Sequence, residues 1–218
     1  VSSGGELLRD EFPLNVSQRV CATPVLTSLA GAGFLAAWGE HDNQSQGAVW
    51  DVYSRVVSAT GPQGSPTLIN TRRDGFQGFP KLANAGDAIL AVYRSAGGDG
   101  VGYGIVGQWI GVDGVRIGSE FVINTQVNGD QIYPSVASDG NGRVLATWST
   151  FQGVSRGMDI AAQRYGRAEA PLSAPAAPYV FALSSSRLQI TWPELTGLPV
   201  KAYEVYVNGA ATPLTSVT

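Results

Sequence analysis

Residues 120–148 read EFVINTQVNGDQIYPSVASDGNGRVLATW, and the pattern of this stretch occurs three times along the chain. Its opening motif ends at Asn124, and similar motifs end at Asn15 and Asn70, so the asparagines stand 55 and 54 residues apart. A proline follows each asparagine after nine or ten residues, and an aromatic residue follows each proline after 13 or 14. The prolines are Pro24, Pro80 and Pro134, and the aromatic residues are Trp38, Tyr93 and Trp148. Landmarks in constant phase indicate an internal repeat, which defines the architecture before any other motif is considered.

Each repeat contains short runs with the composition of β-strands. In the third repeat, residues 134–138 and 143–149 flank an Asp-Gly-Asn-Gly turn, and a further strand is predicted over 158–165. The same order predicts strands at residues 34–38 and 49–57 in the first repeat, and at 88–93 and 103–110 in the second. The segment that ends in asparagine supplies the fourth strand, after a glycine-rich turn. Four short strands in about 50 residues have the dimensions of a propeller blade.

The predicted fold is therefore all-β, with three four-stranded propeller-blade-like repeats over about residues 11–64, 65–118 and 119–166. No segment shows a sustained helical period. Closed propellers typically have about four to eight blades. Three blades leave three possibilities open: the chain is a segment of a longer protein, several copies complete a ring, or the repeats form an open array with exposed edges.

The C-terminal part of the chain loses the repeat. Residues 167–177 are rich in proline and alanine and are predicted to form a stiff linker. Three alternating runs follow, at residues 178–183, 187–193 and 201–209. Their order resembles the N-terminal half of a fibronectin type III domain, over residues 178–218. Because half a sandwich would expose its core, we expect the polypeptide to continue beyond Thr218.

Composition excludes several classes of protein. The chain has 218 residues, with 28 glycines, 12 prolines, 44% hydrophobic residues, 14% charged residues and a net charge of -3. These charges form no basic patch, so nucleic acid is not an expected partner. No stretch reaches the roughly 18 apolar residues of a membrane span. Cys21 is the only cysteine, which excludes an internal disulfide, and it is expected to be buried at the entry to a strand.

The segment from Asp99 to Ala137 resembles a repeat that is common in large bacterial extracellular proteins. The shared pattern is a Glu-Phe-x-Val-Asn-Thr strand, then Pro-x-Val-Ala, then an apolar strand ending in Trp-x-Ser. The second and third copies match it closely, whereas the first has Asn15 followed by Val16. The resemblance implies a secreted or surface-attached repeat region, often beside adhesion-type domains, and no catalytic residues. We therefore expect an extracellular or cell-surface location.

Candidate binding residues lie out of phase with the repeat or in its connections. The connections at residues 40–46, 95–102 and 150–156 are equivalent, differ in sequence and are expected on one face, where they would form a partner surface. The candidates for ligand or partner binding are His41, Asp42, Trp50, Asp99, Tyr103, Trp109 and Phe151. Among them, the two tryptophans and Tyr103 would suit a sugar, whereas the aromatic residues in phase with the repeat are expected in the core.

No catalytic residue or cofactor is predicted. His41 is the only histidine, and no serine or cysteine stands in the context of a nucleophile. Asp99 is a weak calcium candidate, because calcium takes about six to eight oxygen ligands and no loop supplies them at regular spacing. The three asparagines of the repeat are expected to hydrogen-bond the backbone of the turn that follows each of them.

The sequence thus favours a non-enzymatic, adhesin-like binding or scaffold segment of a bacterial surface or secreted protein. Its partner would be a protein or a further copy of the chain, bound through loops or open β-edges, or a glycan. Two alternatives stay open. One is a structural subunit of an extracellular filament or surface layer that assembles through blade edges. The other is an accessory, carbohydrate-binding region of a larger degradative enzyme.

Overall fold

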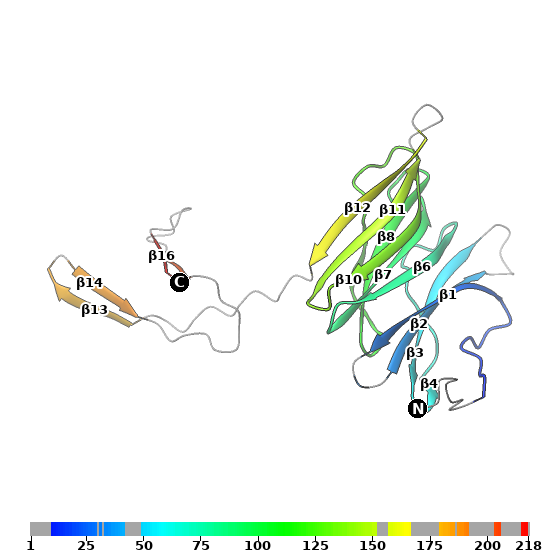
Figure 1. Cartoon of the computed structure of the whole chain (residues 1–218), viewed down its shortest axis with the longest axis horizontal. Coiled ribbons are helices and arrows are strands. Elements are labelled where there is room, and N and C mark those ends of the chain that lie inside the picture. Colours follow the sequence, from blue (N-terminus) through cyan, green and yellow to red (C-terminus); the bar gives the residue numbers. More distant parts are fainter. Residues whose placement is uncertain are drawn as a thin grey trace, which may run out of the picture. The chain divides into compact units, whose positions relative to one another are not determined.

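The computed structural model describes residues 10–29, 31, 33–41, 49–151, 157–166, 179–185, 187–191, 203–205 and 215–217. The chain divides into two compact units, Val1–Arg167 and Ala168–Thr218, which are considered separately. Every helix or strand assigned in the described residues is a β-strand (Figure 1). Among these residues, no helix has the length and apolar character needed to cross a membrane.

Three antiparallel sheets make up the described part of the first unit (Figure 1). The first sheet contains β1 (Val20–Leu29), β2 (Gly33–His41), β3 (Trp50–Ser58), β4 (Gly61–Pro62) and β5 (Thr67–Leu68). The second contains β6 (Gln77–Asn84), β7 (Ala88–Ala96), β8 (Tyr103–Gly111) and β9 (Arg116–Val122). The third contains β10 (Asp130–Ser138), β11 (Arg143–Phe151) and β12 (Met158–Gly166). Strands adjacent in sequence pair in space, as in propeller blades, and the predicted all-β, blade-like fold is confirmed.

The fourth position differs between the sheets. In the second sheet β9 forms it as one strand, whereas β4 and β5 share the outer edge of β3 in the first sheet. Pro62 and Pro66 account for this break, because proline has no N–H to donate to the ladder. In the third sheet, β12 is the last of the described strands.

Each first strand contains a β-bulge at its proline. In β1, Thr23 and Pro24 together stand opposite the single residue Trp38 of β2. The equivalent bulges place Phe79-Pro80 opposite Tyr93 and Tyr133-Pro134 opposite Trp148. A bulge leaves its residues unpaired in the ladder, so a proline without an N–H fits there. The constant distance between proline and aromatic residue in the sequence is therefore the length of one bulged hairpin.

The residue before each of these prolines has a positive φ. The angle is 54° at Thr23, 56° at Phe79 and 54° at Tyr133, and these are the only positive values at non-glycine residues in the described part of the chain. Left-handed backbone is unfavourable for residues with a β-carbon, and a residue before proline normally takes an extended conformation. Its occurrence at three equivalent positions indicates that the bulge imposes it.

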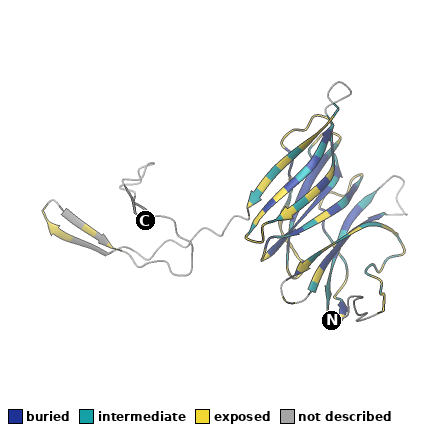
Figure 2. Ribbon diagram, viewed as in Figure 1, coloured by how far each residue is buried: buried dark blue, intermediate teal, exposed yellow. Residues whose placement is uncertain are grey.

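The second sheet lies between the other two, and its inner strands β7 and β8 are buried on both faces. Along β7, Ile89 and Tyr93 belong to the core shared with the first sheet, whereas Leu90 and Val92 belong to the core shared with the third (Figure 2). The three in-phase aromatic residues are 4%, 0% and 6% exposed at Trp38, Tyr93 and Trp148, as predicted for framework positions.

The second unit contains two described hairpins. β13 (Tyr179–Ser184) pairs with β14 (Arg187–Thr191), and β15 (Tyr203–Val205) pairs with β16 (Thr215–Val217). β14 and β15 lie within the runs predicted as strands, and β13 extends one residue beyond its predicted run. The similarity of this unit to a fibronectin type III domain stays a prediction, and most of the proposed linker lies outside the described residues.

Candidate functional site

One end of the three sheets carries the strand ends that flank the connections predicted to form a partner surface. These are the ends at which β2 leads to β3, β7 to β8 and β11 to β12, and we call this end of the first unit the loop end; residues 42–48 and 152–156 of the connections lie outside the described residues. A main-chain hydrogen bond links the first sheet to the segment that leads into the second there, since the Trp50 amide donates to the carbonyl of Gly75 over 3.4 Å. The same segment is bound to β7, because the Ala96 amide donates to the carbonyl of Phe76 over 2.7 Å.

Hydrogen bonds of the repeated asparagines stabilise the turns and strands next to the loop end. Each donates from Nδ2 to the carbonyl two residues ahead, at 3.0 Å for Asn15, 2.7 Å for Asn70 and 2.9 Å for Asn124. The predicted bond to the following turn is thus confirmed three times. The two buried asparagines also accept from a strand: Asn70 Oδ1 from the Val52 amide and Asn124 Oδ1 from the Ile105 amide, both at 2.7 Å.

A carboxylate completes each of these two asparagine sites. Asn70 donates to Asp51 of β3 over 2.7 Å, and Asn124 donates to Asp99 over 2.7 Å. Asp99 comes from a connection, not from the strand. The strand position equivalent to Asp51 is Gly104, where an added β-carbon would lie 2.8 Å from Cγ of Asp99. The glycine therefore leaves space for a carboxylate that enters from the loop.

The hydrogen bonds of Asp99, the calcium candidate, show that its carboxylate has a structural role. Asp99 Oδ1 accepts the Val101 amide at 3.1 Å, while Oδ2 accepts Asn124. Both oxygens thus bind protein donors. In the described residues, no group of three or more His, Cys, Asp or Glu side chains stands together in a way that would hold a metal ion.

Aromatic side chains from the first and second sheets form a continuous series at the loop end. His41 and Trp50 face each other across β2 and β3, with ring centroids 5.3 Å apart. Trp50 lies 6.1 Å from Phe76, which lies 5.6 Å from Phe79 and 6.2 Å from Tyr103. Three of the seven predicted binding residues, His41, Trp50 and Tyr103, are thereby brought together.

Arg94 of β7 lies among three of these rings. Its guanidinium carbon is 4.2 Å from the centroid of Tyr103, 4.5 Å from Phe76 and 4.8 Å from Phe79. Each such contact stabilises by about 0.5 to 2 kcal/mol, depending on desolvation. Arg94 Nε is buried and has no hydrogen-bond partner among the described residues. We call His41, Trp50, Phe76, Phe79, Arg94 and Tyr103 the aromatic–arginine cluster; all six are half-buried.

The remaining candidates lie elsewhere or outside the described residues. Trp109 packs against the core between the second and third sheets, at the far end of β8 from Tyr103. Phe151 ends β11 at the loop end of the third sheet, opposite Asp130 and Met158. Asp42 lies outside the residues that the structure describes.

Sequence reasoning missed Phe76, Phe79 and Arg94. A signal was present for Arg94, because it follows the in-phase Tyr93 at a position occupied by Gly39 and Ser149 in the other repeats. Phe79 replaces Thr23 of the first repeat in the same way. Phe76 lies between the asparagine and proline landmarks, where the repeats differ in length, and only the folded chain shows its contacts.

A second group of polar side chains surrounds Glu40 in the first sheet. Glu40 is 5% exposed, accepts from Trp38 Nε1 at 3.3 Å and forms an ion pair with Arg19 at 3.6 Å. The expectation that Cys21 is buried was wrong: it is exposed, because it lies on β1 at the open edge of the sheet. Partial desolvation, followed by the nearby Glu40 carboxylate, raises the pKa of the Cys21 thiol.

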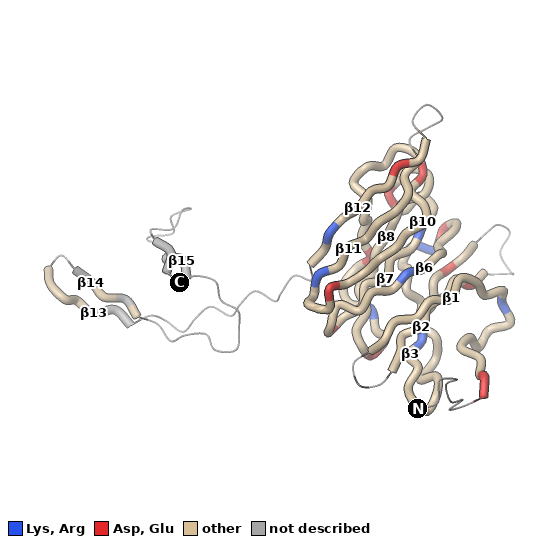
Figure 3. Tube along the Cα trace, viewed as in Figure 1, with Lys and Arg blue, Asp and Glu red and all other residues tan. Residues whose placement is uncertain are grey.

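Other charged groups are dispersed. Arg73 forms an ion pair with Asp51 at 2.9 Å. This pair links the site of Asn70 to the segment that leads into the second sheet. Figure 3 shows Lys, Arg, Asp and Glu scattered along the described parts of the first unit with no run of one sign. At the loop end, the distinctive chemistry of the described residues is therefore aromatic, with one guanidinium among the rings.

Comparisons with known proteins show no family for this chain. No family model matches the sequence, and no curated protein matches it. Among solved structures, the chain is similar to an endo-arabinase from Bacteroides thetaiotaomicron VPI-5482, with 14% identity and a TM-score of 0.47. That match covers 70% of this chain and 58% of the endo-arabinase, so the chain spans less than two thirds of the length of that structure.

Proposed function

We propose that this chain is a non-enzymatic binding and scaffold segment of an extracellular or cell-surface protein, and that it binds carbohydrate through the aromatic–arginine cluster. The observation that supports this proposal is the series of rings from two sheets, with Arg94 among them, at the loop end, where the connections of the repeats differ in sequence. The same activity would suit a scaffold protein or an accessory region of a degradative enzyme.

The chemistry of the cluster fits a sugar. Tyrosine and tryptophan rings present apolar faces with a polar edge, which suits the apolar faces and peripheral hydroxyls of a pyranose ring. A guanidinium supplies up to five N–H donors in a fixed plane. In this cluster the plane is held by Phe76, Phe79 and Tyr103, so little side-chain entropy would be lost on binding.

Substitutions at the cluster test the proposal. The full chain is screened on a glycan array, and affinity for the best glycan is measured by titration calorimetry. Trp50→Ala and Tyr103→Ala should each weaken binding by about tenfold, equivalent to about 1.4 kcal/mol. Arg94→Lys should also weaken it, because lysine keeps the charge but loses the planar contacts with the rings.

Tyr133→Ala provides the matched control, since Tyr133 is 66% exposed on β10 of the third sheet and forms none of the ring contacts of the cluster. It should leave affinity unchanged. Melting temperatures of all variants separate lost binding from lost folding. An array without a bound glycan contradicts the carbohydrate proposal, as does equal affinity in the Trp50 and Tyr133 variants.

A second function is favoured by a different observation. Large apolar side chains are exposed on the outward faces of the first and third sheets, among them Phe34 at 51% and Ile160 at 76%. Exposed apolar faces of this kind indicate association. These faces therefore support the alternative that the chain is a structural subunit of an extracellular assembly.

A further inference from the structure

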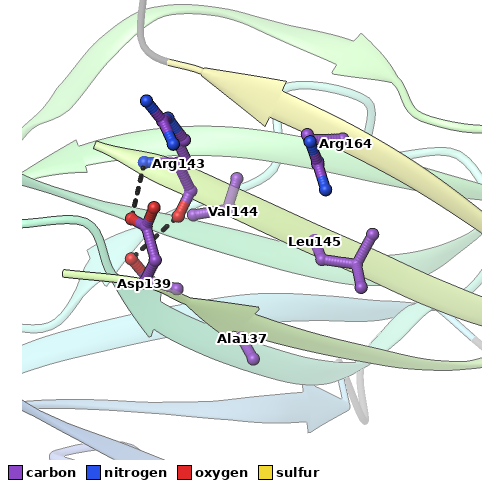
Figure 4. Close-up of a pocket in the computed structure, with 7 residues that line it drawn as sticks. Ala137, Asp139, Arg143, Val144, Leu145 and Arg164 are labelled. Atoms are coloured by element: carbon purple, nitrogen blue, oxygen red, sulfur yellow. Dashed lines mark hydrogen bonds between the residues drawn. The ribbon is translucent and has the colours of Figure 1, made fainter. Parts of the chain in front are cut away.

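The outward face of the third sheet is open and apolar. Leu145 is 46% exposed, Met158 48% and Ile160 76%. Figure 2 shows buried positions alternating with more accessible ones along β11, whereas β12 has exposed and half-buried positions only. A shallow hollow of about 280 Å³ lies on this sheet, with Ala137, Leu145 and Arg164 among its lining residues (Figure 4).

In the other two repeats, the face equivalent to this one is covered by the next sheet along the chain. Leu145 and Ile160 occupy the positions of Leu90 and Ile105 in the second sheet, which are both 0% exposed because the third sheet packs on them. The same positions in the first sheet are Leu35 and Val52, also 0% exposed, and there the second sheet packs on them. In two of three cases, the next sheet of the repeat buries this face.

The opposite face of the first sheet is partly exposed. Leu26 is 64% exposed and Phe34 is 51% exposed, whereas Ala36, Trp38 and Glu40, which follow Phe34 on the same face of β2, are buried. The position of Phe34 is that of Ile89 in the second sheet and Val144 in the third, which are 0% and 2% exposed because each packs on the preceding sheet. The exposed parts of these two faces thus correspond to the two sides of the junction that the chain forms twice internally.

The polar groups that meet at such a junction are also present, but on different sheets: the third sheet has the amide and the carboxylate, and the first repeat has the asparagine. In the second sheet, Asn124 accepts the Ile105 amide and donates to Asp99, a carboxylate from the connection before β8. In the third sheet the equivalent groups are the Ile160 amide and Asp159, which is exposed, and no asparagine among the described residues reaches them. The first repeat has the asparagine without these groups. Among the hydrogen bonds of the described residues, Asn15 makes only the bond to the Ser17 carbonyl in its turn.

We propose that the outward face of the third sheet binds the first sheet of a second copy of this chain. Phe34 and Leu26 of the second copy pack on Leu145 and Ile160, and residues 11–15 of that copy lie along the open edge of β12. Asn15 of the second copy then accepts the Ile160 amide and donates to Asp159, as Asn70 does with Val52 and Asp51.

This contact is heterologous, because different surfaces of the two copies meet. Two copies related by a rotation supply six sheets, which lies within the range of about four to eight blades found in closed propellers. The proposal concerns faces of sheets and the edge of β12, and it is independent of glycan binding at the aromatic–arginine cluster.

The first experiment is sedimentation velocity of the full chain over a wide concentration range. The expected result is a reversible species of twice the monomer mass. Ile160→Asp and Phe34→Asp, each at a largely exposed side chain, should abolish this species without changing the circular dichroism spectrum. Val115→Asp is the matched control, since Val115 is 59% exposed in the turn before β9 and lies on neither open face; it should associate like the unmodified chain.

Mixing the two variants tests the head-to-tail geometry. The Ile160→Asp copy keeps an intact first sheet, and the Phe34→Asp copy keeps an intact third sheet. An equimolar mixture should therefore regain a one-to-one pair through one junction, with weaker affinity than the unmodified dimer. Asn15→Ala should weaken the unmodified dimer by about tenfold or more, whereas Asn141→Ala, at an exposed turn asparagine, should not.

Three results would overturn the proposal. If the chain stays monomeric at every concentration, its two exposed faces do not pair with a second copy, and another part of the same chain covers them. A Phe34→Asp variant that still dimerises shows contact between two third sheets. Dimers that persist in both variants show pairing through edges alone.

Discussion

At the scale of single residues, the buried asparagines of the repeat do more than close a turn. Asn124 is 4% exposed, and its amide group binds the Ile105 amide, Asp99, the Gln126 carbonyl and Gln131. One side chain thus joins a strand, a loop and the start of the next sheet. Sequence reasoning identified the turn bond from the residue type, but the other partners come from segments whose proximity only the fold creates.

Replacing Asn124 should therefore destabilise far more than replacing Asn15. Asn124→Ala leaves several buried polar groups without a partner, and we expect a loss of about 2 to 4 kcal/mol in the free energy of unfolding. Asn15→Ala removes one half-buried turn bond and should cost about 1 kcal/mol or less. Urea denaturation, followed by circular dichroism at a concentration where the chain is monomeric, measures both. Equal losses would contradict this interpretation.

Tyr93 should give the fold a dependence on alkaline pH. Burial first, and then the carboxylate of Glu120, raises the pKa of Tyr93 well above its ordinary value of 10.0. The folded state therefore holds this proton more tightly than the unfolded state does. The resulting stabilisation is fully present below about pH 10 and is lost as the pH rises further.

Tyr93→Phe has no such proton, so its urea midpoint should fall less steeply above pH 10 than that of the unmodified protein. Measurements at pH 8, 10 and 11 compare the two slopes. Parallel curves would show that other groups determine the alkaline limit.

At the scale of elements, the bulged first strand is the unit that the repeat conserves. A proline and an aromatic residue at fixed distance predicted a hairpin, because residues of opposite strands keep a constant separation. The positive φ before each proline could not be predicted, since Thr23, Phe79 and Tyr133 have no residue type in common and none is glycine. Backbone geometry of this kind is imposed by the ladder on both sides of the bulge.

At the bulge residue of a first strand, glycine should therefore give a more stable protein than alanine, although glycine normally destabilises a strand relative to alanine. Tyr133 has a φ of 54° and a side chain that is 66% exposed. Left-handed backbone costs about 1 to 2 kcal/mol when a β-carbon is present, so Tyr133→Gly should be more stable than Tyr133→Ala by about 1 kcal/mol. At Ala137, an exposed residue in the regular part of β10, Ala137→Gly should instead cost about 0.5 to 1 kcal/mol.

Thermal unfolding of these three variants and the unmodified chain decides the sign. The positive φ is an intrinsic property of the bulge if glycine is favoured only at position 133. Were alanine favoured at both positions, the left-handed conformation would not persist in solution.

At the scale of the whole molecule, the second sheet couples the other two. Its inner strands β7 and β8 are buried on both faces, and the two cores are separated only by the thickness of β7 and its neighbours. The sequence predicted three blades and their order, and it placed the in-phase aromatic residues in the core. The aromatic–arginine cluster was predicted only in part, because Phe76 and Arg94 come from different elements and meet through tertiary packing.

This coupling should make the three sheets unfold together. Leu35→Ala creates a cavity in the core between the first and second sheets and should cost about 2 to 5 kcal/mol. Although Leu35 is remote from the third sheet, hydrogen exchange of amides in β11 should accelerate to the same extent as exchange in β2. Leu145→Ala, at the equivalent but half-exposed position, should cost less than about 1.5 kcal/mol. Unchanged exchange in β11 of the Leu35 variant would indicate separate folding units.

The repetition of one junction also has an evolutionary consequence. The second sheet has one face buried by the sheet before it and the other by the sheet after it, and the asparagine contacts of the first two sheets lie at equivalent places. A tandem duplication of one repeat would therefore insert a sheet that matches both of its new neighbours without any compensating substitution. Such a chain can change its number of blades in a single genetic event, while the connections at the loop end diverge independently in each copy.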